Sequence, residues 1–130
     1  MIHKEFDIRL EEEEEKEKVG FLMKRKFNSF KIHNYFKKSF KHGITLEEVN
    51  EIYTQFDKIV CVTKREGIKN NLYCFIYDLG PTKSLYLIFI LDEDPPQFFN
   101  AYYNHTSQHK KINNRIREWV KKKMLSGDVS

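Results

Sequence analysis

The chain has 130 residues, of which 40% are hydrophobic and 32% are charged, and this size fits one domain and excludes a second core. No apolar run approaches the length of a membrane span, and residues 1–10 lack the apolar part of a signal peptide, so we expect a cytoplasmic protein with no membrane partner. The net charge is +4, but residues 1–20 hold eight acids against four bases, and the remaining nineteen bases and eleven acids make the body a candidate binder of polyanions.

The first third of the chain is expected to be largely helical. Strong helix formers predict a helix over residues 10–27, although the alternating residues just before it would also suit a short strand. A second helix is predicted over residues 30–41, and Gly43 is expected to end it in a left-handed conformation. Thr45 and Glu48 have the spacing of a capping box and predict the start of a third helix.

The centre of the chain predicts an antiparallel sheet. Three apolar and aromatic runs are separated by turn sequences at Gly80-Pro81 and residues 92–96, and another strand comes before them. The run over residues 85–91 has no alternation, so it should be covered on both faces. The predicted fold is α+β, with N-terminal helices and a basic C-terminal helix over about residues 107–125 packed on a four-stranded antiparallel sheet over about residues 58–64, 72–79, 84–92 and 97–103.

These elements divide the chain into an acidic helical arm over residues 1–27, a single α+β domain over residues 28–125 and a tail over residues 126–130. The glutamates at 11–15 are expected to form a solvated helix face, or alternatively to shield the basic surface until a partner displaces them. Cys61 and Cys74 lie in predicted strands, where we expect reduced and buried thiols rather than a disulfide.

Neither a metal nor a cofactor is expected. The two cysteines lie on different strands with twelve residues between them, and the sequence has no Cys-x-x-Cys and no His-x-x-x-His pair. The five glycines are scattered singly and form no phosphate-binding loop. A nucleotide-dependent enzyme is therefore not predicted.

Several residues could support metal-independent cleavage of RNA. This chemistry needs a base, an acid and a cation, which histidine, tyrosine, lysine and arginine can supply. The candidates lie at predicted helix and strand ends, where functional sites are usually mounted, and they are His33, His42, Arg65, Tyr103 and His105. Each also has a purely structural interpretation, such as a histidine at a helix boundary or a charged strand edge that discourages pairing.

Two basic segments indicate nucleic-acid binding. Residues 24–41 contain seven bases, no acid and several aromatic residues, and the predicted C-terminal helix carries a second group of bases. An exposed amphipathic helix with no such role is the alternative. The residues expected to contact nucleic acid are Lys37, Lys38, Lys41, Lys64, Lys110, Lys111 and Arg115.

Short motifs in the chain resemble those of a known family. They are the predicted helix with His33, the segment Lys41-His42-Gly43-Ile44 before the capping box, and the strand end Asn100-Ala101-Tyr102-Tyr103. Over about residues 30–115 they resemble the barnase, EndoU, colicin and RelE superfamily of small ribonucleases, and most of all its BrnT-type, phage and polymorphic-toxin members. The resemblance implies helices on a twisted four-stranded antiparallel sheet and metal-independent cleavage of RNA.

The resemblance also implies roles for individual residues. His33 or His42 would be the catalytic histidine, Arg65 or Lys64 the cation beside the phosphate, and the last-strand group would be Tyr103 with His105 or Thr106. The arginine-rich end of the BrnT last strand is absent from this chain. The acidic N-terminal helix is not a feature of the family either, which suggests an added partner-binding or regulatory element.

Three functions remain open from the sequence. The first is a ribonuclease-like toxin or effector whose partners would be RNA and an antitoxin or immunity protein. The second is a nucleic-acid-binding protein without catalysis, of viral or plasmid origin. The third is a protein-interaction or structural module whose acidic arm and basic body bind a partner or another copy of the chain, as in a homodimer.

Overall fold

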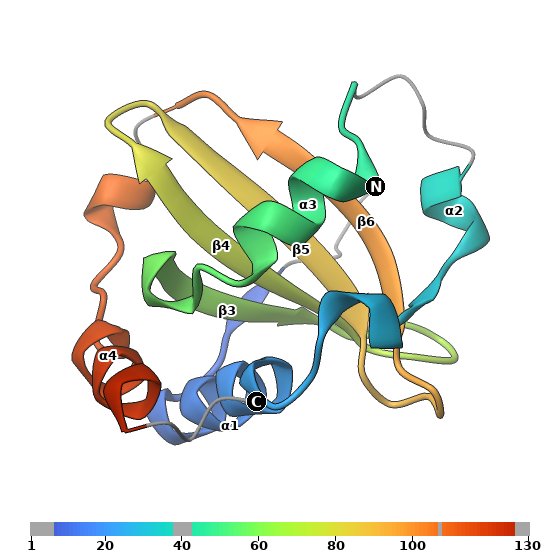
Figure 1. Ribbon diagram of the computed structural model, residues 1–130, viewed down its shortest axis with the longest axis horizontal. Helices are drawn as coiled ribbons and strands as arrows, with labels where there is room; N and C mark the ends of the chain where they lie inside the picture. The colour runs from blue at the N-terminus through green and yellow to red at the C-terminus, as the bar shows by residue number, and fades with distance from the viewer. Residues whose placement is uncertain (1–6, 38–42, 107, 127–130) are drawn as a thin grey trace.

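A computed structural model describes residues 7–37, 43–106 and 108–126 and shows an α+β fold with a six-stranded mixed sheet (Figure 1). The strand order is β1-β3-β4-β5-β6-β2. The α+β class is confirmed, and so is the predicted antiparallel meander. Its strands are β3 Ile59–Arg65, β4 Leu72–Gly80, β5 Lys83–Ile90 and β6 Gln97–Asn104.

Two further strands pair with the edges of the meander, so the prediction of a purely antiparallel four-stranded sheet is wrong. β1, Ile8–Arg9, pairs antiparallel with β3, and β2, Lys31–Ile32, pairs parallel with β6. Each has only two residues, so neither strand is long enough to show an alternating hydrophobic pattern in the sequence. Very short edge strands also offer few unpaired backbone groups to other chains.

β2 occupies the start of the helix that was predicted over residues 30–41. Only α2, Asn34–Lys37, is helical there, and residues 38–42 lie outside the described residues. The His33 backbone N–H donates to the Phe98 carbonyl at 2.9 Å, which continues the pairing with β6. Phe30 is buried in the core just before this pairing. Burial and strand pairing therefore outweigh the local helix propensity.

α1, Glu12–Met23, lies within the region predicted to be the first helix and packs into the main core. Val19 and Leu22 are fully buried in the same cluster as Ile59, Phe75 and Leu87 of the sheet. The helix is followed by the 3-10 turn η1, Phe27–Ser29. The described part of the acidic segment is thus built into the core and does not extend from it as an arm.

α3, Leu46–Tyr53, begins at the predicted capping box, which is confirmed. The Glu48 backbone N–H donates to Thr45 Oγ1 at 3.1 Å, and the Thr45 N–H donates to Glu48 Oε1 at 3.4 Å. Gly43 has a φ of 66°, which confirms its left-handed conformation. A short 3-10 turn, η3 Phe56–Lys58, leads from α3 into β3. Figure 1 shows α3 lying across the sheet, on what we call the first face.

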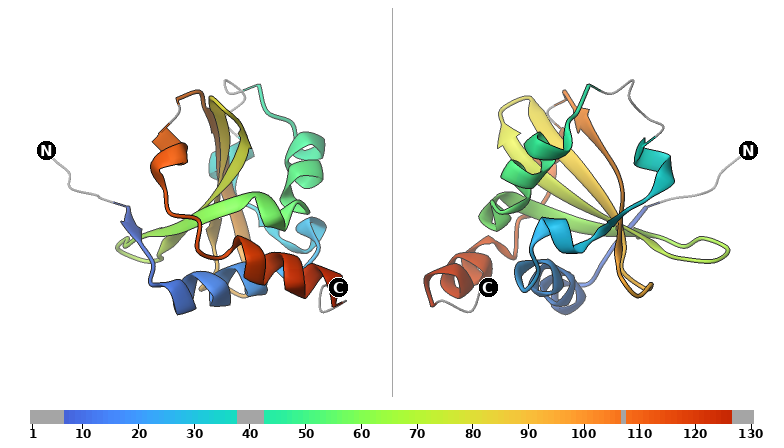
Figure 2. Two further views of the ribbon diagram at one scale, coloured as in Figure 1. Left: turned by 90° about the vertical axis from the view of Figure 1, so that its left-hand side faces the viewer. Right: turned by 45° about the vertical axis from the view of Figure 1, so that its right-hand side comes forward.

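The predicted C-terminal helix is only half as long as expected. α4 spans Arg117–Leu125, and before it come the 3-10 turn η4, Gln108–Lys111, and a segment without regular secondary structure. Ile112 of this segment packs on the opposite, second face of the sheet against Cys61, Cys74 and their neighbours. Figure 2 shows η4 and α3 on opposite sides of the sheet. Packing on the second face thus replaces the first turns of the predicted helix.

Coverage of the sheet differs between its two faces. Leu85, Leu87 and Phe89 of β5 are fully buried on the first face, whereas Tyr86 and Ile88 on the second face are partly exposed. The expectation of complete cover for this strand is therefore correct for the first face only. Both cysteines are buried and free, as expected. No helix within the described residues has the length and apolar content needed to cross a bilayer.

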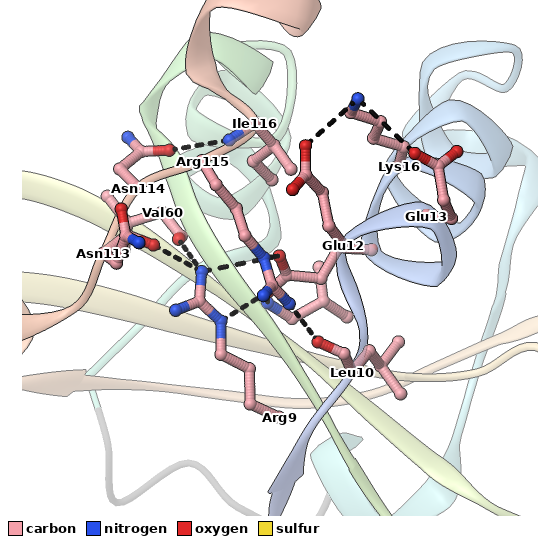
Figure 3. Close-up of polar contacts among 12 residues, drawn as sticks. Arg9, Leu10, Glu12, Glu13, Lys16, Val60, Asn113, Asn114, Arg115 and Ile116 are labelled. Atoms are coloured by element: carbon pink, nitrogen blue, oxygen red, sulfur yellow. Dashed lines mark hydrogen bonds and ion pairs between the residues drawn. The ribbon is translucent and has the colours of Figure 1, made fainter.

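A buried ion network joins α1 to both ends of the described chain (Figure 3). Glu15 is 0% exposed and accepts from Arg9 Nε and Arg115 Nε, each at 2.8 Å, and from the Val62 N–H at 2.9 Å. Arg9 also donates to the carbonyl of Asn113 at 2.6 Å. The glutamate run is therefore not one solvated face, because its last member is a buried counter-charge to two arginines.

Candidate nucleic-acid interface

A groove between α1 and α4 brings the two basic segments of the sequence together. The two helices lie side by side beneath the sheet (Figures 1 and 2). The cavity between them is about 680 Å³. We call it the α1–α4 groove, and its lining residues are Lys16, Glu17, Gly20, Phe21, Met23, Lys24, Arg25, Trp119 and Lys123.

The α1–α4 groove is lined by two aromatic rings and by several cations. Phe21 and Trp119 are both half-buried. The Arg25 guanidinium lies 3.4 Å from the centre of the Phe21 ring, and Lys123 Nζ lies 5.9 Å from that of Trp119. Lys123 follows Trp119 by four positions within α4, which places the two on the same side of that helix. Arg25 lies beyond the end of α1, and its Nη1 donates to the Phe21 carbonyl at 2.9 Å, which holds the guanidinium over the Phe21 ring.

The charge of the α1–α4 groove is strongly positive. It has four basic side chains and one acid, Glu17, which gives 4 − 1 = +3. One of the four, Lys16, has its charge offset by Glu12 at 3.3 Å and Glu13 at 3.8 Å. The other three, Lys24, Arg25 and Lys123, lie just after the end of α1 and in the last turn of α4.

A second cavity of about 370 Å³ adjoins this groove through Arg25, which lines both. It adds Lys26 and the polar side chains Asn28, Asn50 and Thr54. Amide and hydroxyl groups of this kind often contact phosphate and sugar oxygens. The cationic surface of the α1–α4 groove therefore continues into a polar one near the end of α3.

The predicted catalytic residues do not form one cluster in the described part of the chain. Arg65 lies on the second face of the sheet, and His33 contacts Phe99, which lies on that face too, with 4.8 Å between ring centres. Tyr103 packs on the first face, because neighbouring strand residues point to opposite sides. His105 is exposed beyond β6. His42 lies outside the described residues.

Tyr103 has a structural role as a hydrogen-bond donor. Its hydroxyl donates to Glu48 Oε2 at 2.6 Å, and Lys83 Nζ lies 4.4 Å from the centre of its ring. Burial, followed by the contact with the Glu48 carboxylate, raises the pKa of Tyr103 to about 12. The phenol is therefore protonated at neutral pH and cannot act there as a general base.

The contribution of the Tyr103 hydroxyl to the stability of the fold should fall as the pH rises above 10. Its pKa rises from 10.0 to about 12 on folding, so the stabilisation is complete below pH 10 and is lost as the pH rises through 12. We expect Tyr103→Phe to unfold at a lower urea concentration than the wild type at pH 8. The gap between the two midpoints should narrow between pH 10 and 12. A gap that stays constant across this range would contradict the assignment.

The lysines and arginine that were predicted to contact nucleic acid lie outside the α1–α4 groove. Lys37, Lys110 and Lys111 are exposed elsewhere, and Lys64 pairs with Glu66 at 3.6 Å. Arg115 belongs to the internal network around Glu15. Two more, Lys38 and Lys41, lie outside the described residues.

None of the residues that line the α1–α4 groove is among those that the sequence predicted to contact nucleic acid. A usable signal existed in the spacing of Trp119 with Lys123, since it joins an aromatic ring and a cation one helical turn apart. What the sequence did not reveal is that α1 and α4 are neighbours. That contact depends on packing between distant parts of the chain.

No protein-family model, no curated protein and no solved structure matches this chain. The resemblance to the ribonuclease superfamily therefore stays a prediction. Among the described residues, no group of three or more His, Cys, Asp or Glu side chains is arranged to hold a metal ion.

Proposed function

We propose that the protein binds single-stranded RNA in the α1–α4 groove. The observation that supports this most is that two aromatic rings, those of Phe21 and Trp119, line the groove together with the cations. These cations are Lys24, Arg25 and Lys123. Proteins that bind single strands combine a positive groove for the phosphates with aromatic rings on which bases stack. An ordinary exposed helix face needs no half-buried tryptophan among its lysines.

The position of the two aromatic rings in a groove between helices favours a single strand over a duplex. Bases in a duplex are stacked on one another and hidden from a ring that lies between two helices, whereas unpaired bases can reach it. The polar groups of the adjoining cavity, Asn28, Asn50 and Thr54, favour RNA over DNA. Amide and hydroxyl groups can exchange hydrogen bonds with a ribose 2′-hydroxyl, which DNA lacks.

Ribonuclease activity is a separate hypothesis from RNA binding in the α1–α4 groove. It requires groups that converge on one phosphate, and the described candidates Arg65 and Tyr103 lie on opposite faces of the sheet. Binding without catalysis needs no such convergence. The experiments on binding can also detect cleavage, because intact and cut RNA are separable on a gel.

The only tryptophan of the chain, Trp119, lies in the groove and can report binding directly. We expect oligouridylate to quench its fluorescence at low salt. Each phosphate neutralised on a single strand contributes about 0.7 to the slope of log affinity against log salt, so three cations predict a slope of about −2.

Variants of the cations test the site. Lys24→Ala with Lys123→Ala should weaken binding about tenfold, since two contacts of roughly 0.7 kcal/mol each give this factor. The matched control is Lys58→Ala with Lys69→Ala, which removes two exposed lysines away from the groove and should change little. Equal loss in both double variants, or no quenching in the wild type, would refute the proposal.

Incubation of the protein with the same RNA in EDTA tests the ribonuclease hypothesis. Cleavage to 2′,3′-cyclic ends that His33→Ala, His42→Ala or His105→Ala abolishes would establish catalysis and identify a catalytic histidine. RNA that stays intact while it quenches Trp119 would support binding alone.

A further inference from the structure

A glycine, Gly20, lies inside α1 and lines the α1–α4 groove. Glycine is less favourable than alanine in the interior of a helix, because its backbone loses more conformational freedom on folding. This cost calls for a compensating role at Gly20. Neither the backbone of the helix nor its packing against α4 supplies one.

The backbone at this position does not require glycine. Among the described residues, the glycines with a positive φ are Gly43 and Gly80, at 66° and 152°. Gly20 instead belongs to the regular part of α1. An alanine adopts helical φ and ψ angles without strain, so the backbone would accept it.

The packing of α4 against α1 does not require glycine either. A Cβ atom at Gly20 would lie 3.7 Å from Cη2 of Trp119, which is an ordinary van der Waals contact. Apart from the two chain neighbours and the nearby helix backbone, no other atom of the described residues lies within 4 Å of that position. A methyl group would therefore fit, and it would even add a contact.

The glycine does leave open space beside the ring of Trp119. A Cβ atom would already touch this ring, so a longer side chain would extend along it into the α1–α4 groove. Gly20 is partly exposed, which makes the space accessible from solvent. The groove, at about 680 Å³, is as large as the ~300–1,000 Å³ of typical ligand pockets, so a base can enter it.

We infer that Gly20 determines access to the groove: its missing side chain opens the position at which an unpaired base stacks on Trp119. This role rests on the proposed binding of single-stranded RNA in the same groove. Glycine has no side-chain group that could hydrogen-bond a base, so selection at this point is by size and shape. Stacking on an aromatic ring tolerates every base, and the groove should therefore accept purines and pyrimidines alike.

A bulky side chain at this position tests the role of Gly20. Gly20→Leu should weaken the binding of oligouridylate about tenfold, the loss expected when one base no longer stacks on an aromatic ring. The matched control is Thr82→Leu, which adds the same side chain in the exposed turn between β4 and β5 and should bind as the wild type does. Fluorescence anisotropy of labelled RNA is the measurement, because a side chain beside Trp119 would alter the emission of the tryptophan itself.

A small side chain separates a role in binding from a role in folding. Gly20→Ala should raise the urea midpoint of unfolding, because alanine fits the site and favours the helix. It should weaken RNA binding less than Gly20→Leu does. Should Gly20→Leu fail to fold, Gly20→Met takes its place, since the flexible methionine side chain adapts to irregular space.

The outcomes for Gly20 and for the proposed function are distinguishable. Oligouridylate that does not bind the wild type refutes RNA binding in the groove, and the role of Gly20 with it. If the wild type and Thr82→Leu bind, equal binding by the folded leucine or methionine variant overturns the role of Gly20 alone. A Gly20→Ala variant that is less stable than the wild type would overturn it as well, because the glycine would then be needed for packing.

Discussion

Replacing Glu15 by alanine should lower the free energy of unfolding by about 3 kcal/mol, the lower end of the ~3–5 kcal/mol that follows the loss of one partner in a buried ion pair. The carboxylate is fully buried and neutralises both Arg9 and Arg115. Its removal also deprives the buried Val62 N–H of its acceptor. The cost stays near the lower end because the two arginine side chains are 28% and 27% exposed, so water can partly solvate them.

Urea unfolding followed by circular dichroism measures this effect. Glu15→Gln should lose less than Glu15→Ala, because the amide oxygen can still accept from Val62 while the negative charge is gone. Glu13→Ala is the matched control, since its side chain is 90% exposed and a surface substitution of this kind changes stability by at most about 0.5 kcal/mol. If Glu15→Ala were as stable as Glu13→Ala, the network would not be holding the fold together.

Phe89→Ala should cost more, about 3–5 kcal/mol, because it removes the centre of the aromatic core. Phe89 is fully buried, and its ring centre lies between 4.8 and 6.1 Å from those of four other rings. The surrounding rings come from β4, β6, α3 and the segment before β2. They are rigid and come from separate elements, so they cannot all move in to fill the space that is left.

Phe89→Leu separates the loss of volume from the loss of a hydrophobic side chain. It should cost clearly less than Phe89→Ala, since leucine refills part of the cavity. Tyr35→Ala removes an aromatic ring that is half exposed and should cost least of the three. The urea midpoints should follow this order with unchanged slopes. A similar midpoint for Phe89→Ala and Tyr35→Ala would show that the core collapses around the missing ring.

The meander could be predicted because its signals are local. Gly80-Pro81 and residues 92–96 mark the turns, and the runs between them have the composition of strands. β2 could not be predicted in this way, because Lys31–Ile32 becomes a strand only through its pairing with β6. The same holds for the irregular segment before α4, where Ile112 packs on the sheet.

The site was less predictable than the fold. Whether Arg65 and Tyr103 share a face depends on strand alternation. A single bulge in β6 brings the side chains of Phe99 and Asn100 to the same cavity on the second face of the sheet, although consecutive strand residues normally point to opposite faces. The basic segments were visible in the sequence, but the lysines and arginine that face a groove depend on how α1 meets α4. The spacing of charges within a helix shows which residues are neighbours on it, and not what lies opposite them.

The ion network also has a consequence for the order of events on the ribosome. Glu15 meets Arg115 across 100 residues, and Arg9 meets the Asn113 carbonyl across 104. At 5–20 residues per second, the N-terminal segment waits roughly 5–20 s for these partners to be synthesised. Until then the Glu15 carboxylate remains hydrated and α1 has no α4 beside it. The native core therefore closes only once the C-terminal segment has emerged, and nascent chains that are stalled before Arg115 should remain sensitive to protease.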